Sequence, residues 1–340
     1  LTPSEIIKMS YAKGFTRADS ELIDVDFELL RTRYFDDWKN QRGISGKSIE
    51  DILFKTGLAR KDTDGVLKPT LAAVVLFAEY PTNLMDTKCA IRIMQYTGTI
   101  ANYRDVPNLV GIPKTIEGPI IEVIQKAHEY VLTLLQNGIE MHSGFITKYE
   151  MPERAVKEAI TNAVIHRDYF IKRDIEIKLF EDRMEVESPG LLPYNITTSN
   201  IGYVRSEGYR NDSVVKHLRE FPNPPNLDQN EGVRAMRNEM EFNGLYPPIY
   251  ITYPTLDDSV KVVLLNEHRP GEWEIIRSYL EVNKYIANEK AREITKVEQR
   301  DKMSRMFNKW VKQGLLVVVR PKNGGVKATK YKLANTEDVE

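Results

Sequence analysis

The sequence predicts a mixed α/β protein of the α+β type with more than one domain. Apolar residues recur at helical spacing over residues 115–137 and 152–166, whereas residues 175–186 alternate between apolar and charged side chains as a half-buried strand does. The chain has 340 residues, and domains usually contain about 100–200, so two or three domains are expected. Hydrophobic residues make up 41% and charged residues 29%, a composition that excludes disordered and low-complexity chains.

The charge and cysteine counts narrow the classes of function. Lys and Arg total 48 against 49 for Asp and Glu, which excludes a uniformly basic nucleic-acid coat. Cys89 is the only cysteine, so internal disulfides and thiolate zinc clusters are excluded and a cytoplasmic location is expected. No apolar run approaches the ~18–20 residues that span a bilayer, so we expect no membrane contact. The chain begins at Leu1 rather than Met, and we expect a further domain upstream.

The first part of the chain is predicted to join such an upstream domain to a sheet. Residues 1–70 are expected to form a helical connector, because apolar residues such as Ile49 and Ile52 recur at helical spacing. The apolar run at residues 71–77 and the alternating run at residues 90–96 are expected to begin the sheet. A long amphipathic helix over residues 115–137 follows.

The next part predicts a β-hairpin, a long loop and two closing strands. Residues 175–179 and 184–186 alternate on either side of a short turn. Residues 191–231 are rich in Asn, Pro and Gly, with one helical piece near residues 214–218, a composition typical of a lid or a disordered loop. The remaining predicted elements are a helix at residues 232–240 and strands at residues 250–253 and 260–265.

The helix predicted after Pro152 carries the first residues that suggest chemistry. Glu158 and Asn162 are four residues apart, so both side chains project from one face of the helix. A carboxylate can activate a water molecule, and a carboxamide oxygen can join a phosphate in the coordination shell of Mg²⁺. Taken alone, the pair is better explained as an exposed polar stripe on an amphipathic helix.

Several ordered sequence blocks change that interpretation. The blocks are residues 158–169 (EAITNAVIHRDY), 175–177 (IEI), 180–193 (FEDRMEVESPGLLP), 210–211 (RN), 231–240 (EGVRAMRNEM) and 244–248 (GLYPP). With these blocks the chain resembles the divergent GHKL-type ATP-binding domain of RecG-like transcriptional regulators, which is usually preceded by a Schlafen/AlbA-type domain and often followed by a winged helix. The resemblance covers about residues 65–265. It implies a GHKL-like α/β sandwich over residues 71–266, ATP and Mg²⁺ as ligands, and a Schlafen/AlbA-type upstream domain.

The resemblance also implies roles for individual residues. Glu158 is the candidate catalytic base and Asn162 the candidate Mg²⁺ ligand. Ser188 stands where other GHKL ATPases have an aspartate that recognises adenine, and it offers only a hydroxyl, so the sequence leaves the base specificity open. A lone Gly232 replaces the usual Gly-x-Gly and would let the backbone approach a phosphate. The predicted nucleotide site comprises Glu158, Asn162, His166, Asp168, Ser188, Gly190, Arg210, Asn211, Gly232 and Arg234.

Two of these residue types also have ordinary structural explanations. His166 is expected at a helix end beside Arg167 and Asp168, where a histidine is commonly a structural cap. Arg210 and Arg234 are placed to meet phosphate charge, although an arginine on a loop or first helical turn is more often a solvated surface residue. The sequence leaves open whether the site hydrolyses ATP.

Residues 272–334 predict a separate winged helix-turn-helix domain with three helices and a two-stranded hairpin. Residues 272–332 hold 15 Lys or Arg and 7 Asp or Glu, a balance of +8 in a nearly neutral chain. This charge favours binding to DNA phosphates, with Arg305 as the best candidate to reach a base edge. A protein-docking or dimerisation module is the alternative. The predicted DNA-binding residues are Arg300, Lys302, Ser304, Arg305, Asn308, Lys309, Lys322, Lys327 and Lys330.

Two hypotheses for function follow from these domains. The first is a DNA-associated regulator or defence component, expected to be a homodimer, in which the nucleotide orders the lid and changes the spacing of two winged helices on DNA. The second is a scaffold that binds no nucleotide and positions an upstream Schlafen/AlbA-type domain. Ser188 and Asn230, which depart from the GHKL pattern, favour the second hypothesis.

Overall fold

The chain forms two compact units, Leu1–Glu267 and His268–Glu340. The structure is a computed structural model and describes residues 6, 17–46, 48–85, 87–103, 107–140, 144, 146–193, 195–206, 210–225, 232–319 and 329–334. Lys322 and Lys327, which the sequence places on a predicted DNA-binding wing, lie outside the described residues.

A six-stranded sheet forms the centre of the first unit. Its strand order is β4-β3-β5-β6-β8-β7. β3 and β5 run parallel, and the other neighbouring strands run antiparallel. The predicted hairpin is confirmed as β5 and β6. The strands are β3 (Ile91–Gln95), β4 (Lys114–Ile116), β5 (Ile175–Leu179), β6 (Arg183–Pro189), β7 (Ile249–Ile251) and β8 (Ser259–Leu265).

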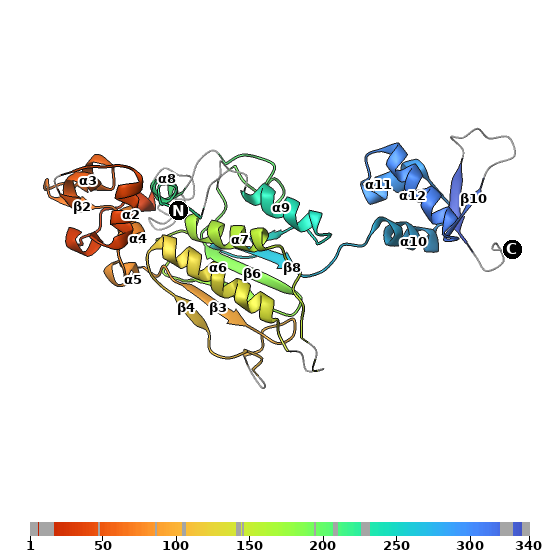
Figure 1. The fold of residues 1–340 in the computed structure, drawn as a ribbon, viewed down its shortest axis with the longest axis horizontal. Coiled ribbons are helices and arrows are strands. Elements are labelled where there is room, and N and C mark those ends of the chain that lie inside the picture. Colours follow the sequence, from red (N-terminus) through yellow and green to blue (C-terminus); the bar gives the residue numbers. More distant parts are fainter. Residues whose placement is uncertain are drawn as a thin grey trace. The chain divides into compact units, whose positions relative to one another are not determined.

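Two long helices lie across one face of this sheet, α6 (Ile120–Asn137) and α7 (Glu153–Ile165) (Figure 1). The alternation in β5 explains the arrangement, because Ile175, Ile177 and Leu179 are buried in the common core. The intervening side chains carry charges that pair with one another, such as Lys178 with Glu176. The predicted α+β sandwich of the GHKL type is thereby confirmed.

The prediction that the sheet begins at residues 71–77 is wrong. This segment is the helix α4 (Leu71–Phe77), and all seven of its residues are buried. The side chain of Thr70 caps it by accepting a hydrogen bond from the backbone N–H of Ala73 at 3.3 Å. A helix that is buried on all sides is apolar on all sides, so its sequence cannot be distinguished from that of a buried strand.

The other elements before the sheet are short and pack around α4. The elements are η1 (Ala18–Ser20), η2 (Phe27–Leu30), α2 (Arg33–Gln41), α3 (Ile49–Lys55), β1 (Ala59–Lys61), β2 (Leu67–Pro69) and α5 (Pro81–Leu84). The predicted helix with Ile49 and Ile52 is present as α3. The sequence did not predict the hairpin formed by β1 and β2.

Two further helices lie in and after the predicted lid region, α8 (Asp212–Leu218) and α9 (Gly232–Phe242). Helix α9 packs along α7. Asp19 is fully buried and caps α8, since its carboxylate accepts the N–H groups of Ser213 and Val214. This contact ties the first part of the chain to the segment that follows the lid region.

The second unit contains three helices and a three-stranded sheet in the order β10-β11-β9. The predicted helices and hairpin strands are present, whereas the two-residue strand β9 was not predicted. Met303, Phe307 and Trp310 line the buried side of α12, and the ring of Tyr331 stacks on that of Phe307 at 3.9 Å. The elements are α10 (Glu272–Val282), β9 (Ile286–Ala287), α11 (Asn288–Thr295), α12 (Arg300–Lys312), β10 (Leu316–Val319) and β11 (Lys330–Leu333).

No helix in the described part of the chain combines the length and the apolar character needed to cross a bilayer.

Candidate functional site

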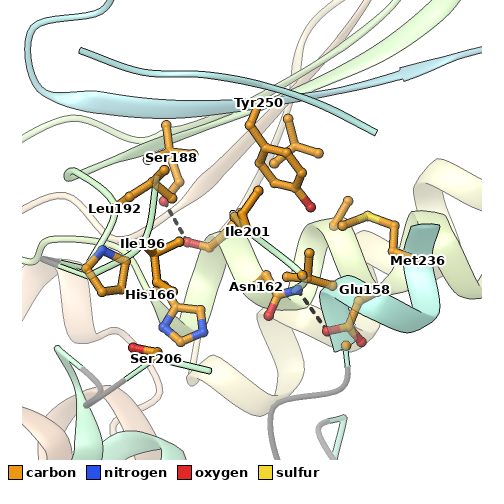
Figure 2. Close-up of a pocket in the computed structure, with 18 of the residues that line it drawn as sticks. Glu158, Asn162, His166, Ser188, Leu192, Ile196, Ile201, Ser206, Met236 and Tyr250 are labelled. Atoms are coloured by element: carbon orange, nitrogen blue, oxygen red, sulfur yellow. Dashed lines mark hydrogen bonds between the residues drawn. The ribbon is translucent and has the colours of Figure 1, made fainter. Parts of the chain in front are cut away.

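A pocket of about 320 Å³ opens beside helix α7 in the first unit (Figure 2). Its walls come from α7, the end of β6, the segment of residues 191–206, the start of α9 and the strands β7 and β8. One part of the lining is polar and includes Glu158 and Asn162. The apolar part includes Val186, Leu192, Pro193, Ile196, Ile201, Met236, Val260 and Val262.

The polar part is built from the Glu158 and Asn162 pair of α7. The two side chains lie on one helix face, as the spacing predicts, and Asn162 Nδ2 donates a hydrogen bond to Glu158 Oε1 at 2.8 Å. This bond fixes the carboxamide so that its oxygen remains for another ligand. A Cβ at position 232 would overlap the Glu158 carboxylate, so a larger residue there would displace this side chain. The first N–H groups of α9 are therefore brought close to α7, and a helix N-terminus favours anions.

Ser188 lies in the pocket wall at the end of β6. Its hydroxyl donates a hydrogen bond to the backbone carbonyl of Ala163 at 2.6 Å, drawn as a dashed line in Figure 2. Ala163 belongs to the last turn of α7, whose carbonyls have no partner within the helix. Because the hydroxyl proton is committed to this carbonyl, the Ser188 oxygen has only lone pairs left and acts as a hydrogen-bond acceptor.

Arg210 and Asn211 satisfy other carbonyls at the same end of α7. Arg210 donates to the carbonyl oxygens of His166 at 3.1 Å and Leu191 at 2.8 Å. Asn211 is fully buried, and its Nδ2 donates to the carbonyl oxygens of Ile165 and Arg167, both at 2.9 Å. Neither residue lines the pocket. Arg210 and Asn211 therefore cap the C-terminal end of α7 from a distant part of the chain. Arg210 also holds the start of the 191–206 segment.

Gly190 connects β6 to this segment in a conformation that favours glycine, with φ +115°. Its N–H donates to the carbonyl of Asp258 at 2.7 Å. The N–H of Asp168 donates to the neighbouring carbonyl of Pro189 at 2.7 Å, and the Asp168 carboxylate accepts the N–H of Phe170. Gly190 lines the pocket, whereas Asp168 lies behind it.

His166 lines the pocket at the C-cap of α7. Burial, together with the neighbouring Arg210 guanidinium, lowers the pKa of His166 to about 4. The imidazole is therefore neutral at pH 7, and it contributes no positive charge toward an anionic ligand.

The pocket thus gathers most of the residues that the sequence assigned to the nucleotide. Glu158, Asn162, His166, Ser188, Gly190, Gly232 and Arg234 line it, and Asp168, Arg210 and Asn211 do not. The segment of residues 191–206 belongs to the region that the sequence suggested as a lid, whereas the contributions of β7 and β8 were not predicted. Residues 250 and 260–262 were predicted only as parts of strands, and nothing in one sequence tells which strand residues face a pocket.

The pocket residues fit a magnesium ion that binds together with a phosphate-containing ligand better than they fit a permanently bound metal ion. Within the described residues no group of three or more His, Cys, Asp or Glu side chains is placed to hold a metal ion. Glu158 and Asn162 offer two oxygen donors at the pocket wall. Mg²⁺ is usually held by one or two protein oxygens together with phosphate oxygens and water, which this donor set fits.

Comparison with known proteins identifies part of this unit. Residues 172–264 match the family model described as "Putative ATP-dependent DNA helicase recG C-terminal". The match supports an ATPase-like domain of the RecG type over β5, β6, α8, α9, β7 and β8. It begins after α7, so Glu158 and Asn162 lie outside it.

The fold is also similar to solved structures. Three solved chains match this one. One is the DIP2311 protein from Corynebacterium diphtheriae, with a TM-score of 0.54 and 14% sequence identity, covering 94% of this chain and 70% of that chain. At this identity the likeness concerns the fold alone. No curated protein matches the sequence.

Proposed function

We propose that the unit Leu1–Glu267 binds an adenine nucleotide together with Mg²⁺ in the pocket beside α7. The observation that carries this proposal is the pairing of Glu158 and Asn162 at a pocket whose other wall is apolar and ends at an acceptor oxygen on Ser188. An apolar slot with a few directed polar groups suits a planar base, and the polar part suits its phosphates.

Ser188 supports adenine over guanine. The exocyclic amino group of adenine is a hydrogen-bond donor, and the lone pairs of the Ser188 oxygen can accept it. Guanine presents a carbonyl oxygen at the corresponding position, which would face those lone pairs without a proton between them. Serine in place of the aspartate of other GHKL ATPases therefore keeps an acceptor, because the Ser188 hydroxyl donates its hydrogen bond to the Ala163 carbonyl.

The chain's own residues then have the following roles. Asn162 would hold Mg²⁺ through its carboxamide oxygen, and Mg²⁺ would neutralise phosphate charge when bound. Glu158 stands beside Asn162 and is the group that would orient and deprotonate a water molecule if the site hydrolyses its ligand. Gly232 and the exposed Arg234 at the start of α9 would face the phosphates.

Thermal unfolding tests the proposal on the full chain. Ligand at roughly 100 times its Kd adds about 2.7 kcal/mol to the unfolding free energy, which corresponds to a rise of about 5 °C in the unfolding midpoint. We expect this rise with ATP and Mg²⁺, and a much smaller one with GTP or with ATP and a chelator. Equal midpoints under all conditions at millimolar nucleotide would contradict the proposal and favour the scaffold hypothesis.

We propose DNA binding as the function of the second unit. The order helix, strand, two helices and two strands supports a winged helix-turn-helix, with α12 as the recognition helix. Arg300, Lys302, Arg305, Asn308 and Lys309 are exposed on α12, as is Lys330 on β11. Ser304 is less available, because Asn288 donates a hydrogen bond to its hydroxyl at 3.0 Å.

The substitution Arg305→Ala tests this second function. Loss of a base-edge contact should weaken binding to duplex DNA about tenfold. Removal of one positive charge should also lower the slope of log affinity against log salt by about 1. Arg277→Ala is the matched control, since Arg277 lies on α10 and pairs with Glu281 at 2.9 Å. Equal affinity and slope in both variants, or no salt-dependent binding by the wild type, would leave α12 as a docking surface for protein.

A further inference from the structure

The side chain of Tyr250 presents a buried hydroxyl group to the pocket. The residue lies on the edge strand β7 and lines the pocket. Figure 2 shows its ring extending from the sheet, with the hydroxyl directed toward the space between Met236, Asn162 and Glu158. The hydroxyl oxygen is buried and has no hydrogen-bond partner among the described residues.

An unpartnered buried hydroxyl costs free energy in the unliganded protein, because folding removes its hydrogen bonds to water. Such groups are few in folded proteins, and each needs an explanation. Burial also raises the pKa of Tyr250, so the phenol keeps its proton and remains a donor throughout the physiological pH range. The hydroxyl therefore always has a proton to donate, and a hydrogen-bond acceptor can satisfy it.

The charges around the hydroxyl indicate which acceptor fits. The charges of Arg237 and Glu158 both influence the Tyr250 hydroxyl, since Arg237 lowers its pKa and Glu158 raises it. Arg237 donates to the carbonyl of Ile201 at 3.2 Å, and its guanidinium lies 4.1 Å above the ring of Tyr203. Its Nε is also buried without a partner in the described structure. Arg237 does not line the pocket, but its nearby positive charge favours an anionic oxygen as the partner of the Tyr250 hydroxyl. Glu158 and Asn162 mark the phosphate end of the pocket.

We propose that the Tyr250 hydroxyl donates a hydrogen bond to a phosphate oxygen of the bound nucleotide. This inference rests on the proposed nucleotide function of the same pocket. It makes Tyr250 a residue that distinguishes phosphorylated ligands from the nucleoside, and it explains why a partly buried edge strand carries a tyrosine rather than a phenylalanine at this position.

The test compares Tyr250→Phe with wild type and with Tyr253→Phe. Tyr253 follows β7 and is 68% exposed. Its substitution therefore removes a hydroxyl of the same kind from the same region without changing the pocket. Titration calorimetry on the full chain measures ATP with Mg²⁺, and adenosine is measured as a competitor. Thermal unfolding without ligand measures the effect on the fold.

We expect the Kd for ATP to rise about tenfold in Tyr250→Phe and to stay unchanged in Tyr253→Phe. The Kd for adenosine, derived from the competition titration, should be the same in all three proteins. The unliganded midpoint of Tyr250→Phe should stay unchanged or rise by roughly 1–2 °C, because the variant removes an unsatisfied buried group.

Three results would overturn the inference about Tyr250 while leaving nucleotide binding intact. They are an unchanged Kd for ATP in Tyr250→Phe, an equal weakening of adenosine and ATP, and a lowered unliganded midpoint, which would mean that the hydroxyl stabilises the fold instead. Failure of the nucleotide function itself gives a different pattern, since wild type and Tyr253→Phe would then show no ATP titration either, and the inference would fall with it.

Discussion

Asn162→Ala is expected to abolish the Mg²⁺-dependent part of ATP binding while leaving the fold intact. Asn162 supplies the carboxamide oxygen proposed to hold the ion, and its Nδ2 holds Glu158 Oε1 at 2.8 Å. Alanine removes the ligand atom and releases the carboxylate from its fixed position. Loss of a ligand to the ion should raise the Kd for ATP with Mg²⁺ by roughly 100-fold. Alanine is a good helix former, so the unfolding free energy should change by less than about 1 kcal/mol.

Titration with ATP, with and without Mg²⁺, measures this effect. The matched control is Asn243→Ala, since Asn243 is exposed after α9 and donates its Nδ2 only to the Glu239 carbonyl at 2.8 Å among the described contacts. Wild type in the presence of a chelator should bind ATP about as weakly as Asn162→Ala. If Asn162→Ala binds ATP with Mg²⁺ as tightly as wild type and the control do, then α7 does not form the metal end of the site.

Gly190→Ala is expected to cost the most stability of the substitutions considered, about 2–4 kcal/mol of unfolding free energy. At φ +115° an alanine is strained whatever the space around it. Its Cβ would also overlap Arg210 Nη1 and lie 3.0 Å from the Cβ of Asp168. Arg210 cannot move aside without breaking its hydrogen bonds to His166 and Leu191, which hold α7 to the 191–206 segment.

Chemical denaturation of the two variants Gly190→Ala and Gly65→Ala measures this cost. Gly65 has φ +81° and no atom within 4 Å of a built Cβ, so its substitution carries the backbone strain alone. We expect the Gly65 variant to lose about 1 kcal/mol. The difference between the two variants then reports the close packing of Gly190 against Arg210. Equal losses of unfolding free energy would mean that Arg210 moves aside at little cost and does not stabilise this end of α7.

Periodicity predicted the elements whose two sides differ in polarity. The hairpin of β5 and β6 has one buried and one charged side, and α7 carries Glu158 and Asn162 on one face, so both were readable from the spacing. The segment Leu71–Phe77 has no polar side, and without such a side the sequence could not distinguish a buried helix from a strand.

The site was predictable in its residue types but not in its detailed contacts. The resemblance placed Arg210 and Asn211 in the nucleotide site, Arg210 as a residue that meets phosphate charge. In the structure both donate to carbonyls at the end of α7, which only the three-dimensional arrangement shows. The sequence suggests that Ser188 weakens base recognition, but in the structure its hydroxyl donates to the Ala163 carbonyl and its oxygen remains an acceptor. Tyr250 gave no signal, because the lack of a partner is a property of the folded environment.

Titration calorimetry of the full chain with ATP and Mg²⁺, against GTP and Mg²⁺ and against ATP with a chelator, tests the central claim most directly. We expect one site per chain for ATP with Mg²⁺, binding at least about tenfold weaker for GTP, and ATP binding roughly 100-fold weaker without the ion. Heat changes that are absent for all three ligands, or binding that is equal for ATP and GTP and indifferent to Mg²⁺, would contradict an adenine nucleotide site built from Glu158, Asn162 and Ser188.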